Sequence, residues 1–444
     1  MATQTLAKIR FGYGLKPGEP AIQEPEALLA EILDPPARAA IATIGPRLDL
    51  LRRHGAARKA EKNGGDAMGA KTLRQRLGQQ RLQDARAAIS RPIGSAAGFQ
   101  ERVFAFWADH FTVSAKNMRL AAVLPAFWDE AIRPHLAGRF ADMLGAVATH
   151  PAMLVYLDQA GSVGPNSRAG RRRGRGLNEN LAREMLELHA LGVGSGYSQG
   201  DVTQLAELLT GLTVNADGFR FNPGMAEPGA EVILGRSYGG ARARLSDIHL
   251  ALEDLAMRPE TAHHLARKLA AHFVADQPDA ALVARMADAY LAADGALPAL
   301  YRALVTDAAA WVPGPQKVKP PLDFMISAFR AFGADDIHDL PAKEIRRRVF
   351  QPLIAMGQPL FKPPGPDGWP GDAAAWITPA LLAARIEWAG WAARSHAGDI
   401  DPRHFVATAL GGGASAPLRF AARAAESKWE GVALILASPE FNRR

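Results

Sequence analysis

The sequence contains no cysteine. Disulfide bonds, thiolate nucleophiles and zinc or iron–sulfur sites with cysteine ligands are therefore excluded. Any metal site would have to be built from histidine and carboxylate side chains, a ligand set that suits Zn, Mn or Fe.

Long apolar runs are also missing. No stretch reaches the roughly 18 consecutive apolar residues that a membrane-spanning helix requires. The opening segment, MATQTLAKIRFGYGLKPGEP, has neither an uninterrupted apolar run nor a small-residue cleavage site. The sequence therefore predicts a cytoplasmic protein without an export signal or a membrane span. Its 444 residues, 48% apolar and 22% charged, are enough for two packed lobes or one large helical body.

Several well-known catalytic motifs are absent. There is no Gly-x-Ser-x-Gly, no Walker loop, and no Gly-x-Gly-x-x-Gly between a strand and a helix. The glycine-rich segment GVGSG at 192–196 follows a predicted helix instead of a strand. These absences argue against serine hydrolases, P-loop enzymes and Rossmann dehydrogenases.

The chain carries a formal net charge of +7, and one short run, SRAGRRRGRG, is strongly basic. Glycine and serine separate its arginines, and no aromatic residue is available there to stack on bases. We therefore expect a flexible solvated loop rather than a nucleic-acid site. The arginines of this run are Arg168, Arg171, Arg172, Arg173 and Arg175.

Apolar residues recur at helical spacing through most of the chain, whereas strand-like alternation is rare. The predicted fold class is all-α, with many short helices. The expected helices span 25–33, 36–53, 70–90, 97–110, 119–132, 138–148, 151–158, 178–191, 199–211, 246–256, 260–274, 278–293, 297–307, 320–332, 342–355, 378–395, 402–409, 415–425 and 427–436.

Two segments depart from the helical pattern. Residues 212–240 contain alternating and consecutive apolar residues with Gly and Pro between them, which predicts a small β-hairpin or irregular excursion. We place a boundary there, between an N-terminal helical lobe at 1–211 and a C-terminal helical lobe at 241–444. The Pro/Gly-rich stretch at 357–372 is too long for a simple connection, and loops of this length are usually functional or act as linkers.

The segment LNENLAREMLELHALG is the most unusual in the sequence. Asn180, Arg183, Glu184 and Glu187 fall at i, i+3, i+4 and i+7, which places them on one polar stripe of a helix. One interpretation is a structural ion-pair network that ties helices together. The other is a functional site in which Glu184 and Glu187 act as metal ligands or as an acid/base pair. Asn178 has a simpler role as a helix N-cap.

His110 is the residue on which the functional interpretation depends. In ERVFAFWADHFTVS it shares a helical face with Val103, Phe106 and Trp107, so it should lie at or near the core. A histidine in that position is usually structural, and it gains a catalytic or metal-binding role only if Glu184 or Glu187 lies beside it. The candidate metal ligands are therefore His110, Glu184 and Glu187, with Asn180 and Arg183 beside them.

Other polar residues have structural explanations. Ser198 and Asp201 form the pattern of a capping box, and His150 precedes a helix that begins with Pro151. The helix TAHHLARKLAAHF has its histidines eight or nine residues apart, whereas two ligands from one helix would be four apart. We interpret that helix as a packing element with exposed basic residues.

Seven segments in order along the chain resemble the family called domain of unknown function 1800. They are FWADHF at 106–111, HPAMLVYLD at 150–158, NENLAREMLELHALG at 178–192, YSQGDV at 197–202, LLTGLTV at 208–214, MGQPLFKPPGPDGWPG at 356–371 and LASPEF at 436–441. The resemblance implies an uncharacterised bacterial protein whose relatives are often exported and often encoded beside a sulfatase-like protein. It brings no established reaction.

The sequence departs from the pattern of that family at two places. The family's loop resembles His-Asp or His-Glu before Pro-Gly, whereas Ala226 precedes Glu227 here, and an Ala-Arg pair is replaced by Ala206 and Glu207. If the missing histidine and arginine belong to a family active site, this chain is altered in specificity or inactive.

Two functions therefore stay open at this stage. The first is an enzyme with a polar site of His110, Asn180, Arg183, Glu184 and Glu187, with a divalent metal as the candidate cofactor. The second is a non-catalytic partner or assembly protein, for which the product of a neighbouring sulfatase-like gene is the candidate partner. The position of His110 relative to Glu184 and Glu187 distinguishes them.

Overall fold

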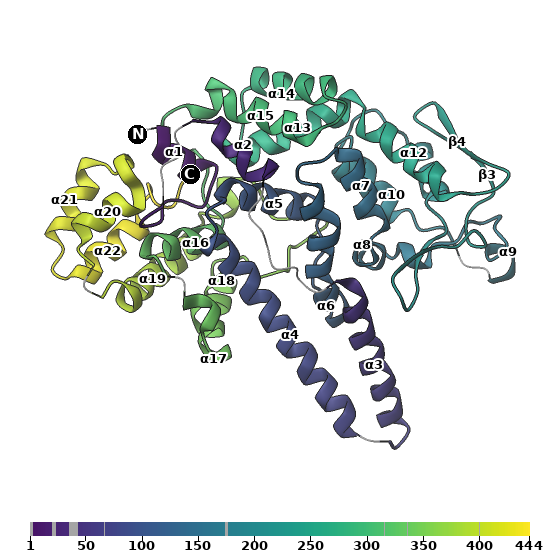
Figure 1. Cartoon of the computed structure of the whole chain (residues 1–444), viewed down its shortest axis with the longest axis horizontal. Helices are drawn as coiled ribbons and strands as arrows, with labels where there is room; N and C mark the ends of the chain where they lie inside the picture. The colour runs from purple at the N-terminus through teal and green to yellow at the C-terminus, as the bar shows by residue number, and fades with distance from the viewer. Residues whose placement is uncertain are drawn as a thin grey trace.

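A computed structural model describes residues 3–19, 24–34, 43–65, 67–173, 176–314, 316–334, 336–398 and 400–444. Helices dominate these residues, so the prediction of a mostly helical protein is confirmed (Figure 1). None of the helices in the described ranges is both long enough and apolar enough to span a membrane.

The first part of the chain folds into helices of very different length. Those before residue 212 are α1 (Thr3–Arg10), α2 (Glu26–Leu33), α3 (Ile44–Lys62), α4 (Ala67–Gly94), α5 (Gly98–His110), α6 (Met118–Phe127), α7 (Phe140–Thr149), α8 (Pro151–Tyr156), α9 (Gly170–Arg173), α10 (Asn180–Glu184) and α11 (Gln199–Leu208). A π-helical turn, Met185–His189, continues α10 directly.

The excursion at 212–240 is the main β structure of the described residues, as predicted. It forms two separate antiparallel hairpins instead of one. Strand β1 (Leu212–Val214) pairs with β2 (Phe219–Phe221), and β3 (Gly229–Ile233) pairs with β4 (Arg236–Gly240). The second hairpin turns through two residues with positive φ, Leu234 and Gly235, which suits the right-handed twist of its strands.

Helices resume after the hairpins and continue to the end of the chain. They are α12 (Leu245–Ala256), α13 (Pro259–Phe273), α14 (Ala280–Ala292), α15 (Leu297–Thr306), α16 (Pro321–Phe332), α17 (Ala342–Ile345), α18 (Gln351–Ala355), α19 (Pro379–His396), α20 (Pro402–Leu410), α21 (Ala416–Ala424) and α22 (Lys428–Ala437). In Figure 1 the last four form a group beside α16 and close to the N-terminal helix α1.

Buried apolar side chains of the described residues form two clusters. The first draws on residues between Phe11 and Ala310, including Leu212, Ile233 and Tyr238 of the hairpins. The second contains Ile89 and Ile93 of α4 together with residues 324–441. The predicted lobe boundary at 212–240 stays a prediction, and the hairpins pack on the first cluster.

Helices α3 and α4 pack side by side as a hairpin that projects from the body (Figure 1). We call this hairpin the arm. Helix α3 was predicted at 36–53, whereas it begins at Ile44 and continues to Lys62, and residues 35–42 lie outside the described ranges. Its second half has almost no apolar stripe, but its alanines, arginines and lysines are strong helix formers.

A buried ion pair fixes the arm at its base. Arg47 of α3 donates to both carboxylate oxygens of Asp84 on α4, at 2.8 and 2.7 Å. The same guanidinium donates to the carbonyl oxygen of Ala122 on α6, at 2.7 Å. Arg47 is only 1% exposed, and the carboxylate of Asp84 stabilises its buried charge.

We predict that Asp84→Ala lowers the free energy of unfolding by about 3 kcal/mol, because the variant removes the carboxylate that accepts two hydrogen bonds from a buried guanidinium. The control is Asp49→Ala on the same arm, since Asp49 pairs with Arg52 and Arg53 in an exposed position. That variant should cost about 0.5 kcal/mol. Urea unfolding measures both, and equal losses would contradict the role given to Arg47.

Candidate functional site

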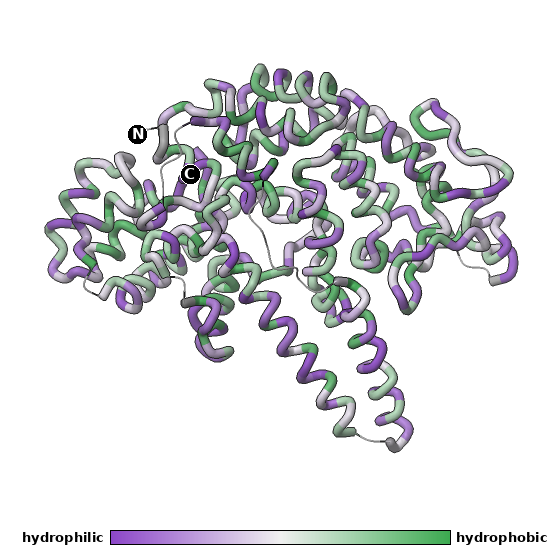
Figure 2. The backbone as a smooth tube through the Cα atoms, in the orientation of Figure 1, coloured by the Kyte–Doolittle hydropathy of each residue, from purple (hydrophilic) through white to green (hydrophobic). Residues whose placement is uncertain are grey.

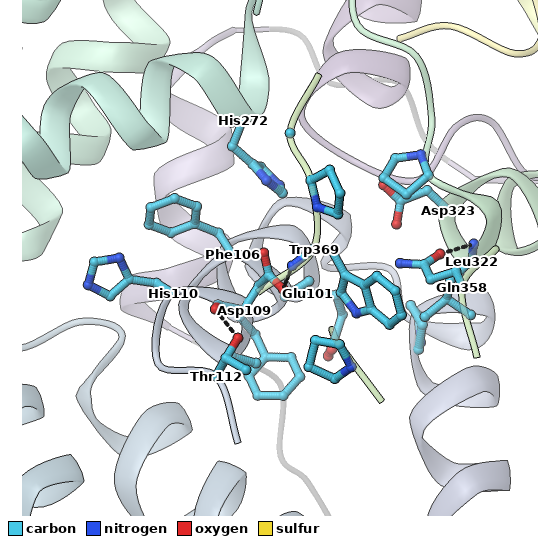
Figure 3. A pocket seen from close by; sticks show the side chains of 18 of the residues that line it. Glu101, Phe106, Asp109, His110, Thr112, His272, Leu322, Asp323, Gln358 and Trp369 are labelled. Carbon is cyan, nitrogen blue, oxygen red and sulfur yellow. Dashed lines mark hydrogen bonds between the residues drawn. The ribbon is translucent and has the colours of Figure 1, made fainter. Parts of the chain in front are cut away.

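A cavity with a volume of about 490 Å³ lies between helices of the described residues. Its walls come from α5, α13, α16 and the Pro/Gly-rich loop at 357–372 (Figure 3). We call it the central cavity. Cavities of this size typically hold a small-molecule ligand.

Helix α5 forms one wall because its two faces differ in polarity. Phe99, Val103 and Trp107 are buried, and the indole Nε1 of Trp107 donates to the hydroxyl of Tyr301 at 2.7 Å. Anchored in this way, the helix presents Phe106 and Asp109 to the central cavity. The core therefore fixes the position of Asp109.

The loop at 357–372 lies against the opposite side of the cavity and is held by hydrogen bonds at several points. The carbonyl of Phe361 accepts from the amide of Ala115 at 2.8 Å, and Gln358 Oε1 accepts from the amide of Leu322 at 2.7 Å. Lys317 Nζ donates to the carbonyl of Gly371 at 2.6 Å. The loop is thus a fixed wall of the cavity, in keeping with the functional interpretation of its length.

Gly368 brings this loop into direct contact with Asp109. A Cβ at position 368 would lie 2.7 Å from Asp109 Oδ1, and its φ of +85° also favours glycine. The close approach lets the amide of Trp369 donate to Asp109 Oδ1 at 2.9 Å (Figure 3). Two segments that carry the family resemblance, FWADHF and GPDGWPG, therefore meet at this carboxylate.

The Asp109 carboxyl lies where its charge is disfavoured. Burial raises its pKa from 3.8 to about 7, and the nearby charges of Asp367 and Asp323 act in the same direction. The Trp369 amide and the charge of Lys268 oppose the rise without cancelling it. A substantial fraction of Asp109 is therefore protonated at neutral pH.

Lys268 enters the cavity from α13. Burial lowers its pKa below 10.5, against the attraction of Asp109 and Asp367. No ion pair within 4 Å joins Lys268 to any described carboxylate. The central cavity therefore contains an amine and a carboxyl that influence each other without being in contact.

The other buried charges around the cavity are paired. Asp323 accepts from both Arg102 and Arg444, and Lys317 pairs with Asp276. Glu101 accepts from Arg133 at 3.2 Å. The contrast singles out Asp109 and Lys268, which are half-buried in the cavity wall and form no ion pair with a described residue. Titratable groups with shifted pKa values in a cavity are candidates for a functional site.

The residues predicted on the Asn-Glu-Asn helix lie elsewhere. Arg183 donates to Glu179 at 3.2 Å and to Glu187 at 3.4 Å, and its side chain is 39% exposed. Asn180 is exposed, and neither it nor Glu184 lines the central cavity. Of the predicted stripe, Arg183 and Glu187 thus form an ion pair near the surface, whereas Glu184 forms no ion pair with a described residue.

His110 reaches the same helix at its opposite end. The last carbonyl groups of a helix have no backbone donor within that helix, and here side chains bind two of them. His110 Nε2 donates to the carbonyl of His189 at 3.0 Å. His264 Nε2 donates to the carbonyl of Leu188, also at 3.0 Å. Burial lowers the pKa of His110 well below 6.5, so the ring is neutral. In Figure 3 the ring points away from Asp109 and Trp369.

The predicted metal ligands are not brought together. Within the described ranges, no group of three or more histidine or carboxylate side chains is arranged to hold a metal ion. The charge of Asp367, which lines the cavity, raises the pKa of both Glu184 and Asp109. A metal at His110, Glu184 and Glu187 stays a prediction.

Several of the structural interpretations are confirmed. Ser198 and Asp201 form a capping box, and His150 Nδ1 accepts from the amide of Ala152 at 3.1 Å. At the start of α10 the N-cap position is Glu179 instead of the predicted Asn178, although Asn178 Oδ1 accepts from the amide of Asn180 at 2.8 Å. Ala226 and Glu227 are buried at the hairpins, where Glu227 accepts from Asn166.

The basic run was expected to be a loop. It contains the short helix α9, on which Arg171 and Arg172 are exposed, while Arg175 lies outside the described residues.

Sequence reasoning missed Asp109 and misplaced Lys268. Asp109 lies in the last turn of α5, where a negative charge opposes the helix dipole, and that conflict was a usable signal. On α13, His264, Lys268 and His272 follow one another at i, i+4 and i+8 beside the apolar face. Lys268 and His272 line the cavity, in contrast to the expectation of exposed basic residues.

Comparison with known proteins gives one match. The sequence profile of a family described as "Protein of unknown function (DUF1800)" matches residues 7–443. No curated protein and no solved structure matches the chain.

We predict that His110→Phe lowers the free energy of unfolding by about 1 to 3 kcal/mol at pH 8, because the buried carbonyl of His189 loses its donor. The pKa of His110 is lower in the folded protein than in the unfolded chain. The contribution of His110 to the free energy of unfolding is therefore present above pH 6.5 and is lost as the pH falls below that value. The difference between wild type and variant should accordingly narrow at pH 5.

Chemical unfolding at the two pH values measures this effect, and the exposed His263→Phe on α13 is the control. An equal difference at both pH values would contradict the assignment of a neutral, hydrogen-bonded His110.

Proposed function

The chain belongs to the DUF1800 family of proteins of unknown function, and we propose that it is an enzyme that uses Asp109 and Lys268 for acid–base chemistry on a small molecule in the central cavity. One observation carries the proposal. Asp109 and Lys268 line the same cavity, one as a carboxyl group and the other as an amine, and form no ion pair with each other. A purely structural pair would be joined.

Asp109 is suited to transfer a proton. A general acid or base works best when its pKa is close to the pH at which it acts, and burial brings the pKa of Asp109 to about 7. Its Oδ1 accepts from the Trp369 amide, which fixes the orientation of the carboxyl group. The second carboxyl oxygen, Oδ2, is left as the atom that gives or takes the proton.

Lys268 is suited to stabilise negative charge on the reacting molecule. Its ammonium group acts in a partly desolvated space, where electrostatic interactions are stronger than in water. The absence of a paired carboxylate keeps the amine available to a ligand. Transfer of the Asp109 proton to the ligand would leave a carboxylate that the same ammonium stabilises.

The walls of the cavity indicate the class of substrate. Phe106, Trp128, Phe361 and Trp369 supply aromatic surface, while Gln358 lies at the far side beside Asp323 (Figure 3). Aromatic walls with a few polar groups suit a small molecule that has an apolar face and one or two polar substituents.

A second function, a non-catalytic partner protein, rests on a different observation. The pairs of Arg183 with Glu179 and Glu187 fit the structural network expected for such a protein. Under this proposal the product of a neighbouring sulfatase-like gene remains the candidate partner. Co-expression of the two genes tests it, since a stable complex would support it and separate elution would count against it.

For the enzyme, we predict that Asp109→Asn and Lys268→Met each reduce turnover by about 100-fold or more. A panel of chromogenic esters, amides and glycosides identifies a reaction of the wild-type protein, and the variants are then compared on it. Asp217→Asn changes an exposed carboxyl and should leave the rate unchanged. Wild-type turnover by Asp109→Asn would refute the role of this residue.

The raised pKa of Asp109 also leads to a prediction about protein stability, which can be tested without a substrate. Its pKa is about 7 in the folded protein and 3.8 as the reference value, so the folded state holds the extra proton between these values. This extra proton stabilises the folded state at low pH, and the stabilisation is lost as the pH rises through 7. Asp109→Asn is neutral at every pH and keeps an oxygen acceptor for the Trp369 amide.

We therefore predict that Asp109→Asn is more stable than wild type at pH 8, by about 1 kcal/mol or more, and that the gain shrinks at pH 5. Thermal or urea unfolding of the two proteins at both pH values measures the gain. A gain that is independent of pH would contradict the raised pKa.

A further inference from the structure

The arm carries most of the net charge of the protein. Between residues 49 and 81 there are nine Lys and Arg residues against three Asp and Glu residues, a net charge of +6 out of +7 for the chain. All nine basic side chains are exposed. Hydrophilic residues recur along both helices of the arm in Figure 2. The nine are Arg52, Arg53, Arg58, Lys59, Lys62, Lys71, Arg74, Arg76 and Arg81.

Few of these positive charges are paired with carboxylates of the described residues. Of the nine, only Arg52 and Arg53 form ion pairs with described residues, and they share the single carboxylate of Asp49. Like charges also stand one turn apart, as at Arg58 and Lys62, which destabilises an isolated helix. A projecting hairpin with this excess of positive charge therefore attracts anionic partners.

The basic residues follow lines along the helices. Arg52, Lys59 and Lys62 are spaced at i, i+7 and i+10 on α3, and Lys71, Arg74 and Arg81 at i, i+3 and i+10 on α4. Each line is about 15 Å long at 1.5 Å per residue. This length matches several successive phosphates of a nucleic-acid strand, which are about 3.4 Å apart along the axis.

A second basic segment lies beside the base of the arm. The guanidinium of Arg86 on α4 donates to the carbonyl of Leu340, just before α17. In the turn of chain that follows, Lys343 and Arg346 are exposed and form no ion pair with a described residue. The positive surface therefore continues from the arm onto the body.

We propose that the arm binds the phosphate backbone of a double-stranded nucleic acid. No Phe, Tyr or Trp occurs between residues 44 and 98, so the arm has no side chains to stack on single-stranded bases. The same absence, together with the lack of an apolar face, disfavours insertion into a membrane interface. Six of the nine basic residues are arginines, whose forked guanidinium groups bind phosphate in a bidentate way.

This surface is distinct from the arginine run at 168–175, for which the sequence argued against nucleic acid. The run lies around α9, away from the arm in Figure 1. It provides a matched control, because two of its exposed residues, Arg171 and Arg172, can be changed with the same effect on net charge.

The test measures binding of the full chain to a fluorescent duplex of about 25 base pairs, by anisotropy, at several salt concentrations. Wild type is compared with the arm variant Lys62→Glu/Lys71→Glu and the control variant Arg171→Glu/Arg172→Glu. We expect wild type to bind and its affinity to fall steeply with salt. The arm variant should lose at least about tenfold in affinity, and the slope of log K against log salt should shrink by about 1.8.

The control variant should bind like wild type. A milder variant, Lys62→Gln/Lys71→Gln, removes charge without reversing it and should show an intermediate loss. The proposal is overturned if wild type does not bind duplex at about 50 mM salt, or if the two charge-reversed variants weaken binding equally. It is also overturned if wild type binds vesicles containing phosphatidylserine and not the duplex.

Discussion

The buried carboxylate of Asp323 is the interaction on which the central cavity depends. It lies on α16 and accepts from Arg102 on α5 and from Arg444 near the end of the chain. Arg102 also donates to His272 Nε2 on α13, at 3.0 Å. Three helices that wall the cavity are thus joined through one acid. Removing it would leave two buried guanidinium groups without their carboxylate, a far larger cost than the loss of an exposed pair.

Asp109 and Lys268 also line the cavity, but unlike Asp323, Arg102 and Arg444 they form no ion pair with a described residue. Asp109 lies at the carboxyl end of α5, where the helix dipole disfavours its charge, and the loop at 357–372 encloses it further. Gly368 is what permits that enclosure, because any side chain there would collide with the carboxyl group. The fold therefore places a carboxyl group with a raised pKa and an amine without an ion pair to a described residue in one cavity, and the proposal of an enzymatic function rests on that combination.

The sequence predicted the regular parts of the fold well. The helix expected at 97–110 is α5 at Gly98–His110, and the helix expected at 260–274 is α13 at Pro259–Phe273, because both have a continuous apolar face. The outer part of α3 was missed for the opposite reason, since it packs few apolar residues. The family resemblance is confirmed over residues 7–443.

The site was harder to predict, because its contacts join distant parts of the chain. His110 does reach the Asn-Glu-Asn helix, but its hydrogen-bond partner is a backbone carbonyl 79 residues away. The order of side chains in a sequence does not indicate which distant carbonyl a histidine will bind. The contact between Asp109 and the Trp369 amide spans 260 residues. The helical face of His110 was predicted correctly, whereas its neighbour Asp109, on the adjacent face, is the one that enters the cavity.

The ionisation of Asp109 tests the central claim most directly. The carboxyl carbon of ¹³C-labelled aspartate, assigned by its loss in Asp109→Asn, can be followed by NMR as the pH is raised. The account predicts a midpoint near 7, and a higher midpoint in Lys268→Met because the ammonium charge that favours the carboxylate is gone. A midpoint near 3.8 that does not respond to Lys268→Met would contradict it.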